Sequence, residues 1–286
     1  MVTIAVTAAS GHLGHAIVKA LIARDGTDTV IALARTPEKA KDLGVEVRPG
    51  DYDDRAGLER SLSGVDVVLL VSGMSEPGER IGQHRNVIEA AKSAGVGKIV
   101  YTSVQGPADG TSFSPVVKSN RQTEQDVRES GLEWVIGRNG IYIEPDIDYI
   151  ESYKAAGEIA NCAGDGKCGY TTRAELAYAY AQMLLSDAHN GQTYNLHGEC
   201  LTQAQLADHL NQAFGTSLVY RAMSVEDYRQ DRIAELGEFI GTVITGIYAG
   251  IRQGGFDNIS NYAEAAGRPH QAWSDYFSRI KTDASA

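Results

Sequence analysis

The sequence predicts a doubly wound, parallel α/β sheet followed by a smaller and mostly helical C-terminal lobe. Short runs rich in β-branched residues alternate with helical patterns over the first half of the 286-residue chain. Several runs are apolar at consecutive positions, as strands covered by helices on both faces must be. After about residue 143 this alternation ends. We therefore expect residues 1–143 to form a nucleotide-binding domain, and residues 144–286 to form a smaller lobe interleaved with it.

Six strands are expected in the first part of the chain, and the segments between them are long enough for helical crossovers. They span residues 3–6, 29–34, 45–48, 65–71, 98–103 and 132–137. The first connecting helix shows one apolar stripe, made of Leu13, Ile17, Val18, Leu21 and Ile22. A later helix carries Val87, Ile88 and Ala91 on one face and stops at Gly95. Both helices are expected to pack on the sheet.

The second part of the chain is expected to contain one strand at residues 192–196 and a helix at 203–213. The stretch 225–251 also reads as helix. Its apolar positions suit a lid over the cleft or the contact of a homodimer, and they are Leu236, Phe239, Ile240, Val243, Ile244 and Ile247.

Composition and charge exclude several classes of protein. The 26 basic and 37 acidic residues give a net charge of −11, so nucleic acid and anionic membranes are not expected partners. No apolar run is long enough to span a membrane, and the N-terminus lacks a secretory signal, which favours a cytoplasmic protein. Three cysteines match no zinc or disulfide pattern and are expected to be buried or incidental thiols. His189, His197 and His209 have no companion pattern, so no metal is expected.

A phosphate-binding loop is expected directly after the first strand. Residues 7–14 read Thr-Ala-Ala-Ser-Gly-His-Leu-Gly and lead into the first amphipathic helix, whose N-terminal amides and dipole favour an anion. This is the strand, glycine loop and helix of a Rossmann dinucleotide site, although Ala8 stands where the first glycine is usual. The residues expected to hold the pyrophosphate are Ala8, Ala9, Ser10, Gly11, His12 and Leu13.

The end of the second strand predicts which cofactor is bound. A NAD site usually has an acidic residue there, whereas this strand ends at Arg35 and is followed by Lys39. A guanidinium can pair with a 2′-phosphate in a bidentate manner, which favours NADPH. The alternative is that Arg35 is only a solvated basic residue.

Three further loops should border the same groove. After the third strand, Asp51 is expected to accept a hydrogen bond from the adenine amino group and Tyr52 to stack nearby, or the loop may simply cap a helix. The fourth and fifth strands end beside the pyrophosphate and the reacting ring, at Val71, Ser72, Gly73, Thr102 and Ser103.

Ordered motifs over nearly the whole chain resemble those of the NmrA-like atypical short-chain dehydrogenases. Within that group they are most similar to type 2 NADPH-dependent quinone oxidoreductases and triphenylmethane reductases. The motifs that carry the resemblance lie at residues 5–14, 35, 50–52, 83–88, 101–103, 138–142, 163–167 and 171–173.

The resemblance implies a Rossmann domain, bound NADPH and a cleft in which a flat, electron-poor acceptor such as a quinone meets the nicotinamide. It places Asn139, Gly140, Ile141 and Tyr142 beside the nicotinamide. The sequence departs from the family at Ala8 and at Asn120, where relatives often have His or Lys.

The catalytic pair Tyr-x-x-x-Lys of ordinary short-chain dehydrogenases is missing, because residues 112–124 contain Lys118 but no tyrosine. Hydride transfer to a quinone is less demanding and needs mainly alignment of two rings and a hydrogen-bond donor. The candidate donors are Tyr142, Asn139 and, more weakly, Lys118, and Tyr142 is equally suited to line the cleft without transferring a proton. His84 reads as a structural histidine, and Arg173 as a tie between the lobes.

A second class of function stays open at this stage. Some NmrA-like proteins bind NADP(H) and report its redox state to a partner without turnover. The missing Tyr-x-x-x-Lys pair and Ala8 suit such a sensor as well as they suit a quinone reductase.

Overall fold

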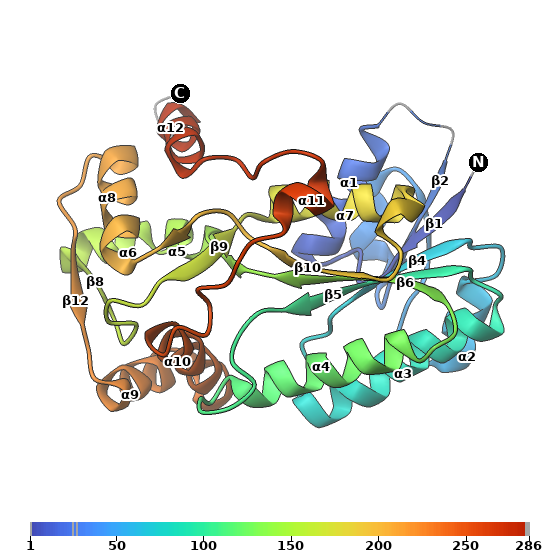
Figure 1. Cartoon of the computed structure of the whole chain (residues 1–286), viewed down its shortest axis with the longest axis horizontal. Coiled ribbons are helices and arrows are strands. Elements are labelled where there is room, and N and C mark those ends of the chain that lie inside the picture. Colours follow the sequence, from blue (N-terminus) through green and yellow to red (C-terminus); the bar gives the residue numbers. More distant parts are fainter. Residues whose placement is uncertain (1, 25, 27, 284–286) are drawn as a thin grey trace.

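The computed structural model describes residues 2–24, 26 and 28–283, and its centre is a seven-stranded parallel sheet (Figure 1). The strand order is β10-β6-β5-β4-β1-β2-β3. The strands are β1 (Thr3–Val6), β2 (Thr29–Ala34), β3 (Glu46–Pro49), β4 (Val67–Val71), β5 (Lys98–Val104), β6 (Glu133–Asn139) and β10 (Gln192–Leu196). The doubly wound parallel sheet predicted from the sequence is therefore confirmed, and all six predicted strands are present.

Helices cover both faces of this sheet (Figure 1). One face carries α1 (His12–Ile22) and α7 (Arg173–Leu185), and the other carries α2 (Arg55–Ser61), α3 (Pro77–Ser93) and α4 (Ser114–Arg128). In β1, the side chains of Ile4 and Val6 pack into the core beneath α1 and α7, whereas Ala5 packs into the core beneath α2, α3 and α4. This alternation explains why the strands are apolar at consecutive positions. A 3-10 helix, η1 (Pro37–Leu43), connects β2 to β3.

The smaller lobe contains short helices and two small sheets. The sheets have the orders β11-β9-β7 and β12-β8. Their strands are β7 (Ile141–Tyr142), β8 (Glu158–Asn161), β9 (Cys168–Thr171), β11 (Cys200–Leu201) and β12 (Val219–Ala222). The helical segments are α5 (Glu144–Asp148), α6 (Ile150–Ala156), η2 (Asp187–His189), α8 (Gln203–Phe214), α9 (Val225–Leu236), α10 (Glu238–Arg252), α11 (Tyr262–Ala266) and α12 (Trp273–Asp283).

The two parts of the chain are interleaved. The expected strand at 192–196 is β10, which pairs in parallel with β6 and completes the main sheet, and α7 packs against α1. The second part of the chain thus supplies one strand and one helix to the first. The division into residues 1–143 and 144–286 stays a prediction.

The expected helix at 225–251 is in fact two helices. Gly237, with φ of +82°, separates α9 from α10. A positive φ ends a helix and is easily adopted by glycine, so the helical prediction for 225–251 is confirmed, with a break at Gly237 that was not predicted.

Within the described residues, no helix combines the length and the apolar character needed to cross a membrane.

Candidate cofactor site and active site

A groove for a nucleotide forms where the parallel strands end. The chain leaves β1 toward β2 on one side and enters β4 on the other, so the loops after β1 and β4 diverge at this point of the sheet. Ligands of open α/β sheets bind at such a switch point. The structure brings the predicted loops after β1, β2, β3, β4, β5 and β6 to this one edge.

The loop after β1 presents unpaired backbone amides. Gly11 precedes α1 in an extended conformation, offers no side-chain cap, and accepts the first helical hydrogen bond from the His15 amide. The amides of His12, Leu13 and Gly14 therefore have no partner within the helix, and the first turn holds no acidic residue. Such a helix start fits the pyrophosphate of a dinucleotide.

Gly14 is required for the helix to approach the loop. A Cβ atom at this position would lie 2.5 Å from the Ala8 carbonyl oxygen and 3.0 Å from the Ala9 Cα. The close approach of α1 to the end of β1 thus depends on the absence of a side chain, as the dinucleotide motif predicts.

Ala8 adopts the conformation that the usual first glycine would adopt. Its φ is +47°, and it is the only non-glycine residue with positive φ in the described part of the chain. The Ala8 carbonyl accepts from the Gly11 amide at 2.9 Å, and the Ala9 amide donates to Leu33 at 3.0 Å. The loop therefore keeps its turn with alanine in place of glycine, at a local cost in backbone energy.

Arg35 lies exposed at the end of β2, where the sequence places it. Within residues 2–24, 26 and 28–283, no hydrogen bond or ion pair engages its guanidinium. Its charge is available for a 2′-phosphate. Lys39 is also exposed, one turn into η1.

Tyr52 is buried beneath the groove and has a different role from the expected stacking. Its hydroxyl lies 2.5 Å from Thr7 Oγ1 and donates to the Val71 carbonyl at 2.7 Å. Thr7 Oγ1 also accepts from the Val71 amide at 2.9 Å. Because these bonds join the ends of β1 and β4 to the loop after β3, Tyr52 fixes the floor of the groove.

His84 holds the loop after β4, as expected of a structural histidine. Its Nε2 accepts from the Gly73 amide at 3.0 Å, and its Nδ1 lies 2.9 Å from Thr123 Oγ1. Burial lowers the pKa of His84 to about 3, so the ring is neutral. On the same loop, the Ser72 amide donates to Thr102 Oγ1 at 2.8 Å.

Asp51 forms a turn of its own loop, because its Oδ1 accepts from the Asp53 amide at 3.1 Å. The cap of α2 is Asp54, which accepts from the Gly57 amide at 2.9 Å. The helix-capping alternative therefore applies to Asp54 and leaves the second oxygen of Asp51 free for a ligand.

A hollow of about 410 Å³ opens beside this loop, lined by Asp53, Glu79, Gly82, Gln83 and Asn86. Gln83 Nε2 donates to Asp53 at 3.1 Å, and Asn86 Nδ2 donates to the Tyr52 carbonyl at 2.9 Å. These acceptors and donors suit the edge of a nucleobase.

The two strongest candidate donors lie side by side at the end of β6. Tyr180 donates from its hydroxyl to Asn139 Oδ1 at 2.6 Å, which fixes the orientation of the Asn139 amide. Asn139 Nδ2 then donates to the Tyr142 hydroxyl oxygen at 3.5 Å. No acceptor for the Tyr142 hydroxyl proton is found among the described residues, so this proton is available to a ligand.

Arg173 begins α7 and lies over the ring of Tyr142, with 5.4 Å between its guanidinium carbon and the ring centroid. Its backbone amide donates to Glu144 Oε1 at 2.7 Å. Arg173 was expected to bind a carboxylate, and among the described residues it does so through its backbone amide, not through its guanidinium. Burial raises the pKa of Tyr142, while Asn139 and Arg173 lower it less strongly, so the phenol is protonated at neutral pH.

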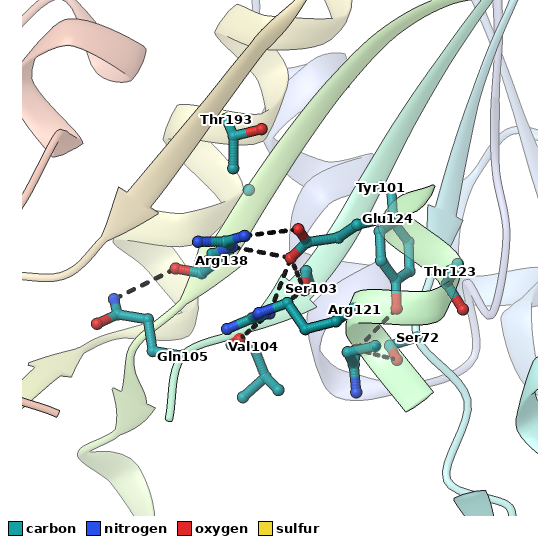
Figure 2. Close-up of polar contacts among 12 residues, drawn as sticks. Ser72, Tyr101, Ser103, Val104, Gln105, Arg121, Thr123, Glu124, Arg138 and Thr193 are labelled. Atoms are coloured by element: carbon teal, nitrogen blue, oxygen red, sulfur yellow. Dashed lines mark hydrogen bonds and ion pairs between the residues drawn. The ribbon is translucent and has the colours of Figure 1, made fainter. Parts of the chain in front are cut away.

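A buried carboxylate fixes the ends of β5 and β6 (Figure 2). Glu124 on α4 accepts from Arg138 Nε at 2.8 Å and Nη2 at 2.7 Å, and from the Ser103 hydroxyl at 2.7 Å. Arg121 and Arg128 also bond to it, at 2.8 and 3.1 Å. The Ser103 side chain therefore points to α4, and Arg138 is anchored immediately before Asn139.

Lys118 lies on the exposed face of α4 and forms an ion pair with Asp109 at 2.6 Å. Among the described residues, it has no hydrogen bond to Asn139 or Tyr142. The structure thus gives no support to Lys118 as a proton donor.

Several residues hold the loops of the site through hydrogen bonds that the sequence does not reveal, namely Thr7, Asn120, Thr123 and Tyr180. Of these, Thr123 and Tyr180 lie in no motif that the sequence analysis detected. Asn120 Oδ1 accepts from Ser72 and from Tyr101, at 3.1 and 2.7 Å. The residue that departs from the family pattern therefore has a structural role, with its side chain buried.

The cysteines are free thiols, as expected, and three of the histidines have partners within the fold. Cys162 and Cys168 are buried free thiols, and burial raises the pKa of Cys162 to about 11. His189 bonds to Tyr194 at 3.0 Å, His209 stacks on Phe277, and His197 Nδ1 lies 2.7 Å from the Gly198 carbonyl.

Comparison with known proteins supports the assignment of the groove to a nicotinamide cofactor. The family model described as NAD(P)H-binding matches residues 8–187. Quinone oxidoreductase 2 of Escherichia coli (strain K12) is 36% identical over 275 residues, covering 93% of this chain and 94% of the relative.

Solved structures agree over nearly the full length. The NADPH-dependent quinone oxidoreductase of Escherichia coli, complexed with NADPH, superposes with a TM-score of 0.88 at 33% identity, covering 97% of this chain and 99% of the other. The triphenylmethane reductase of Citrobacter sp., complexed with NADP(H), gives 0.89 at 30% identity and the same coverage. The similarity to quinone oxidoreductase 2 and to triphenylmethane reductase confirms the resemblance that the motifs predict, and the chain belongs to the NAD(P)H-binding family.

Proposed function

We propose that this protein is an NADPH-dependent quinone oxidoreductase, which reduces a quinone or a similar conjugated, electron-poor acceptor. The observation that carries the proposal is the match over 93% of the chain to a quinone oxidoreductase. The relatives named above are reductases, so nothing in the comparisons favours the alternative of a redox sensor without turnover.

The residues at the carboxyl edge of the sheet fit NADPH. The amides of His12, Leu13 and Gly14 would bind the pyrophosphate, and Arg35 would bind the 2′-phosphate. Asp51 would accept a hydrogen bond from the adenine amino group, and the neighbouring hollow would hold the base. The segment from Asn139 to Tyr142 would hold the nicotinamide end.

NADPH supplies the hydride when it is bound, and the protein supplies alignment and a proton. Negative charge develops on a carbonyl oxygen of the acceptor as it is reduced. Tyr142 has a protonated hydroxyl for which the described residues supply no acceptor, and Asn139 and Tyr180 fix its oxygen in place. We assign Tyr142 as the donor to this oxygen, with Asn139 as its partner.

The test is acceptor-dependent loss of absorbance at 340 nm with NADPH or NADH and 1,4-benzoquinone. Wild-type protein should oxidise NADPH in preference to NADH. Arg35→Ala should lower kcat/KM for NADPH by about tenfold to a hundredfold, the usual effect of lost hydrogen bonds between charged groups, and leave NADH almost unchanged.

Lys41→Ala provides the matched control, because Lys41 is an exposed basic residue of η1 beyond the tip of β2. It should retain the NADPH preference. Binding of NADPH without oxidation by any quinone would contradict the proposed activity, and an unchanged preference in Arg35→Ala would contradict the role of Arg35.

A further inference from the structure

A second cavity lies in the smaller lobe, between the α5–α6 segment and the α9–α10 pair. Its volume is about 340 Å³. Four tyrosines and one buried carboxylate form much of its wall, namely Tyr149, Tyr153, Tyr228, Tyr248 and Asp146. None of these residues takes part in the cofactor site described above.

Asp146 is a buried carboxylate without a basic partner. Asp146 is only 4% exposed, and its Oδ1 accepts a hydrogen bond from the Tyr153 hydroxyl at 2.8 Å. Within the part of the chain that the structure describes, no Lys, Arg or His forms an ion pair with it. Burial raises its pKa to about 6, so at neutral pH it carries a negative charge that the fold does not balance.

The tyrosine rings come from two separate segments of the lobe. Tyr149 and Tyr153 lie with ring centroids 6.2 Å apart, and Tyr228 and Tyr248 meet edge to face at 5.4 Å. The faces of tyrosine rings attract cations. The hydroxyls of Tyr228 and Tyr248 have no hydrogen-bond partner among the described residues, which leaves them free for a ligand.

The one basic residue of the wall is already paired. Arg232 forms an ion pair with Glu235 at 2.8 Å and lies over the Tyr228 ring at 5.4 Å. Glu235 also accepts from the Tyr149 hydroxyl at 2.9 Å. The charge that lacks a partner in this cavity is therefore the negative charge of Asp146.

We propose that this cavity binds a protonated arylalkylamine, with its ammonium group at Asp146 and its ring between the tyrosine pairs. The volume is at the lower end of the usual range for small-molecule pockets and suits a ligand with one or two rings. A charge-assisted hydrogen bond to Asp146 would supply the missing counter-ion. This site is independent of the proposed reductase activity.

The test is isothermal titration calorimetry of the full-length protein with 2-phenylethylamine and, as its neutral isostere, 2-phenylethanol. At pH 7.5 the amine should bind at least about tenfold more tightly than the alcohol, because only the amine is charged. Asp146→Asn should abolish that difference. Asp148→Asn changes an exposed carboxylate on the same helix and should preserve it.

A third variant covers the case in which Asp146→Asn does not fold. Ala160→Leu enlarges a side chain in the cavity wall and should weaken binding of both compounds. Equal affinity for amine and alcohol in the wild type, or full binding in Ala160→Leu, would overturn the proposal. So would competition between the amine and NADPH, because it would place the amine in the cofactor groove.

Discussion

The hydroxyl of Tyr142 owes its orientation to two neighbours. Tyr180 binds the amide oxygen of Asn139, and this leaves the amide nitrogen to face the oxygen of Tyr142. A phenol held in this way presents its proton outward. Removing the hydroxyl should therefore affect the chemical step more than the binding of the cofactor.

Tyr142→Phe should lower kcat by about tenfold or more and leave the Kd for NADPH unchanged. Since burial raises the pKa of Tyr142 above its ordinary value near 10, any alkaline loss of kcat that Tyr142 causes should have its midpoint above pH 10. Steady-state kinetics across pH test both statements, with Tyr178→Phe as a control on α7. An alkaline loss of kcat with a midpoint below pH 10 that Tyr142→Phe abolishes would contradict the protonated state assigned here.

Ala8→Gly should stabilise the protein or leave its stability unchanged. Alanine at a φ of +47° costs about 1–2 kcal/mol, and the entropy of glycine in the unfolded chain offsets about 0.5–1 kcal/mol of that cost. Ala9→Gly, at a buried neighbour whose φ is not positive, should destabilise the fold by about 1 kcal/mol. Urea unfolding of both variants measures the difference, and an equal loss in the two would show that Ala8 is not strained.

At the scale of single residues, local signals predicted the positions of Arg35 at the end of β2 and of residues 8–13 at the start of α1, while their contacts with NADPH stay a prediction. The role of Tyr52 was less accessible, because its hydroxyl bonds to Thr7 and Val71, which are distant in sequence. Tyr180 was not predicted at all. It reaches Asn139 across 41 positions, and no local pattern records such a contact.

At the scale of elements, α1 lies so close to the loop after β1 that no side chain fits at Gly14. Gly14→Ala should force α1 away from the loop and cost about 1–3 kcal/mol of stability, with a larger loss of NADPH affinity. Gly78→Ala, in the first turn of α3, meets no atom within 4 Å and should be tolerated. Thermal unfolding and NADPH titration compare the two, and wild-type affinity in Gly14→Ala would refute the close-packing role.

Strands such as β1 and β4 were predictable because burial on both faces makes them apolar at consecutive positions. The small strands β7, β8, β9, β11 and β12 were not predicted. They lie outside the repeated strand and helix alternation that identified β1 and β3, which are also short. The boundary at Gly237 was also missed. Apolar residues continue at helical spacing on both sides of it, so periodicity alone does not reveal the break.

At the scale of the whole molecule, two buried groups should shape the dependence of stability on pH in opposite ways. The unfolded chain protonates His84 below pH 6.5, whereas the folded protein resists until about pH 3, so the free energy of unfolding falls between these values by up to about 5 kcal/mol. Asp146 has a raised pKa of about 6, so the folded protein takes up this proton first and regains stability between pH 6 and about 4.

Urea unfolding at pH 7.5, 6, 5 and 4 separates the two effects. His84→Gln should be less stable than the wild type at pH 7.5 but lose less stability on acidification. Asp146→Asn should lose more than the wild type over the same range. Parallel curves for all three proteins would be inconsistent with these assignments.

The position of β10 has a consequence for how the protein is made. This strand closes the edge of β6, yet it leaves the ribosome more than fifty residues after β6 does. Until then, the nascent chain carries a sheet with an open apolar edge next to Asn139, the kind of edge that pairs with other chains. The end of the groove that holds Asn139 and Tyr142 is therefore completed late in synthesis, when α7 and β10 arrive together.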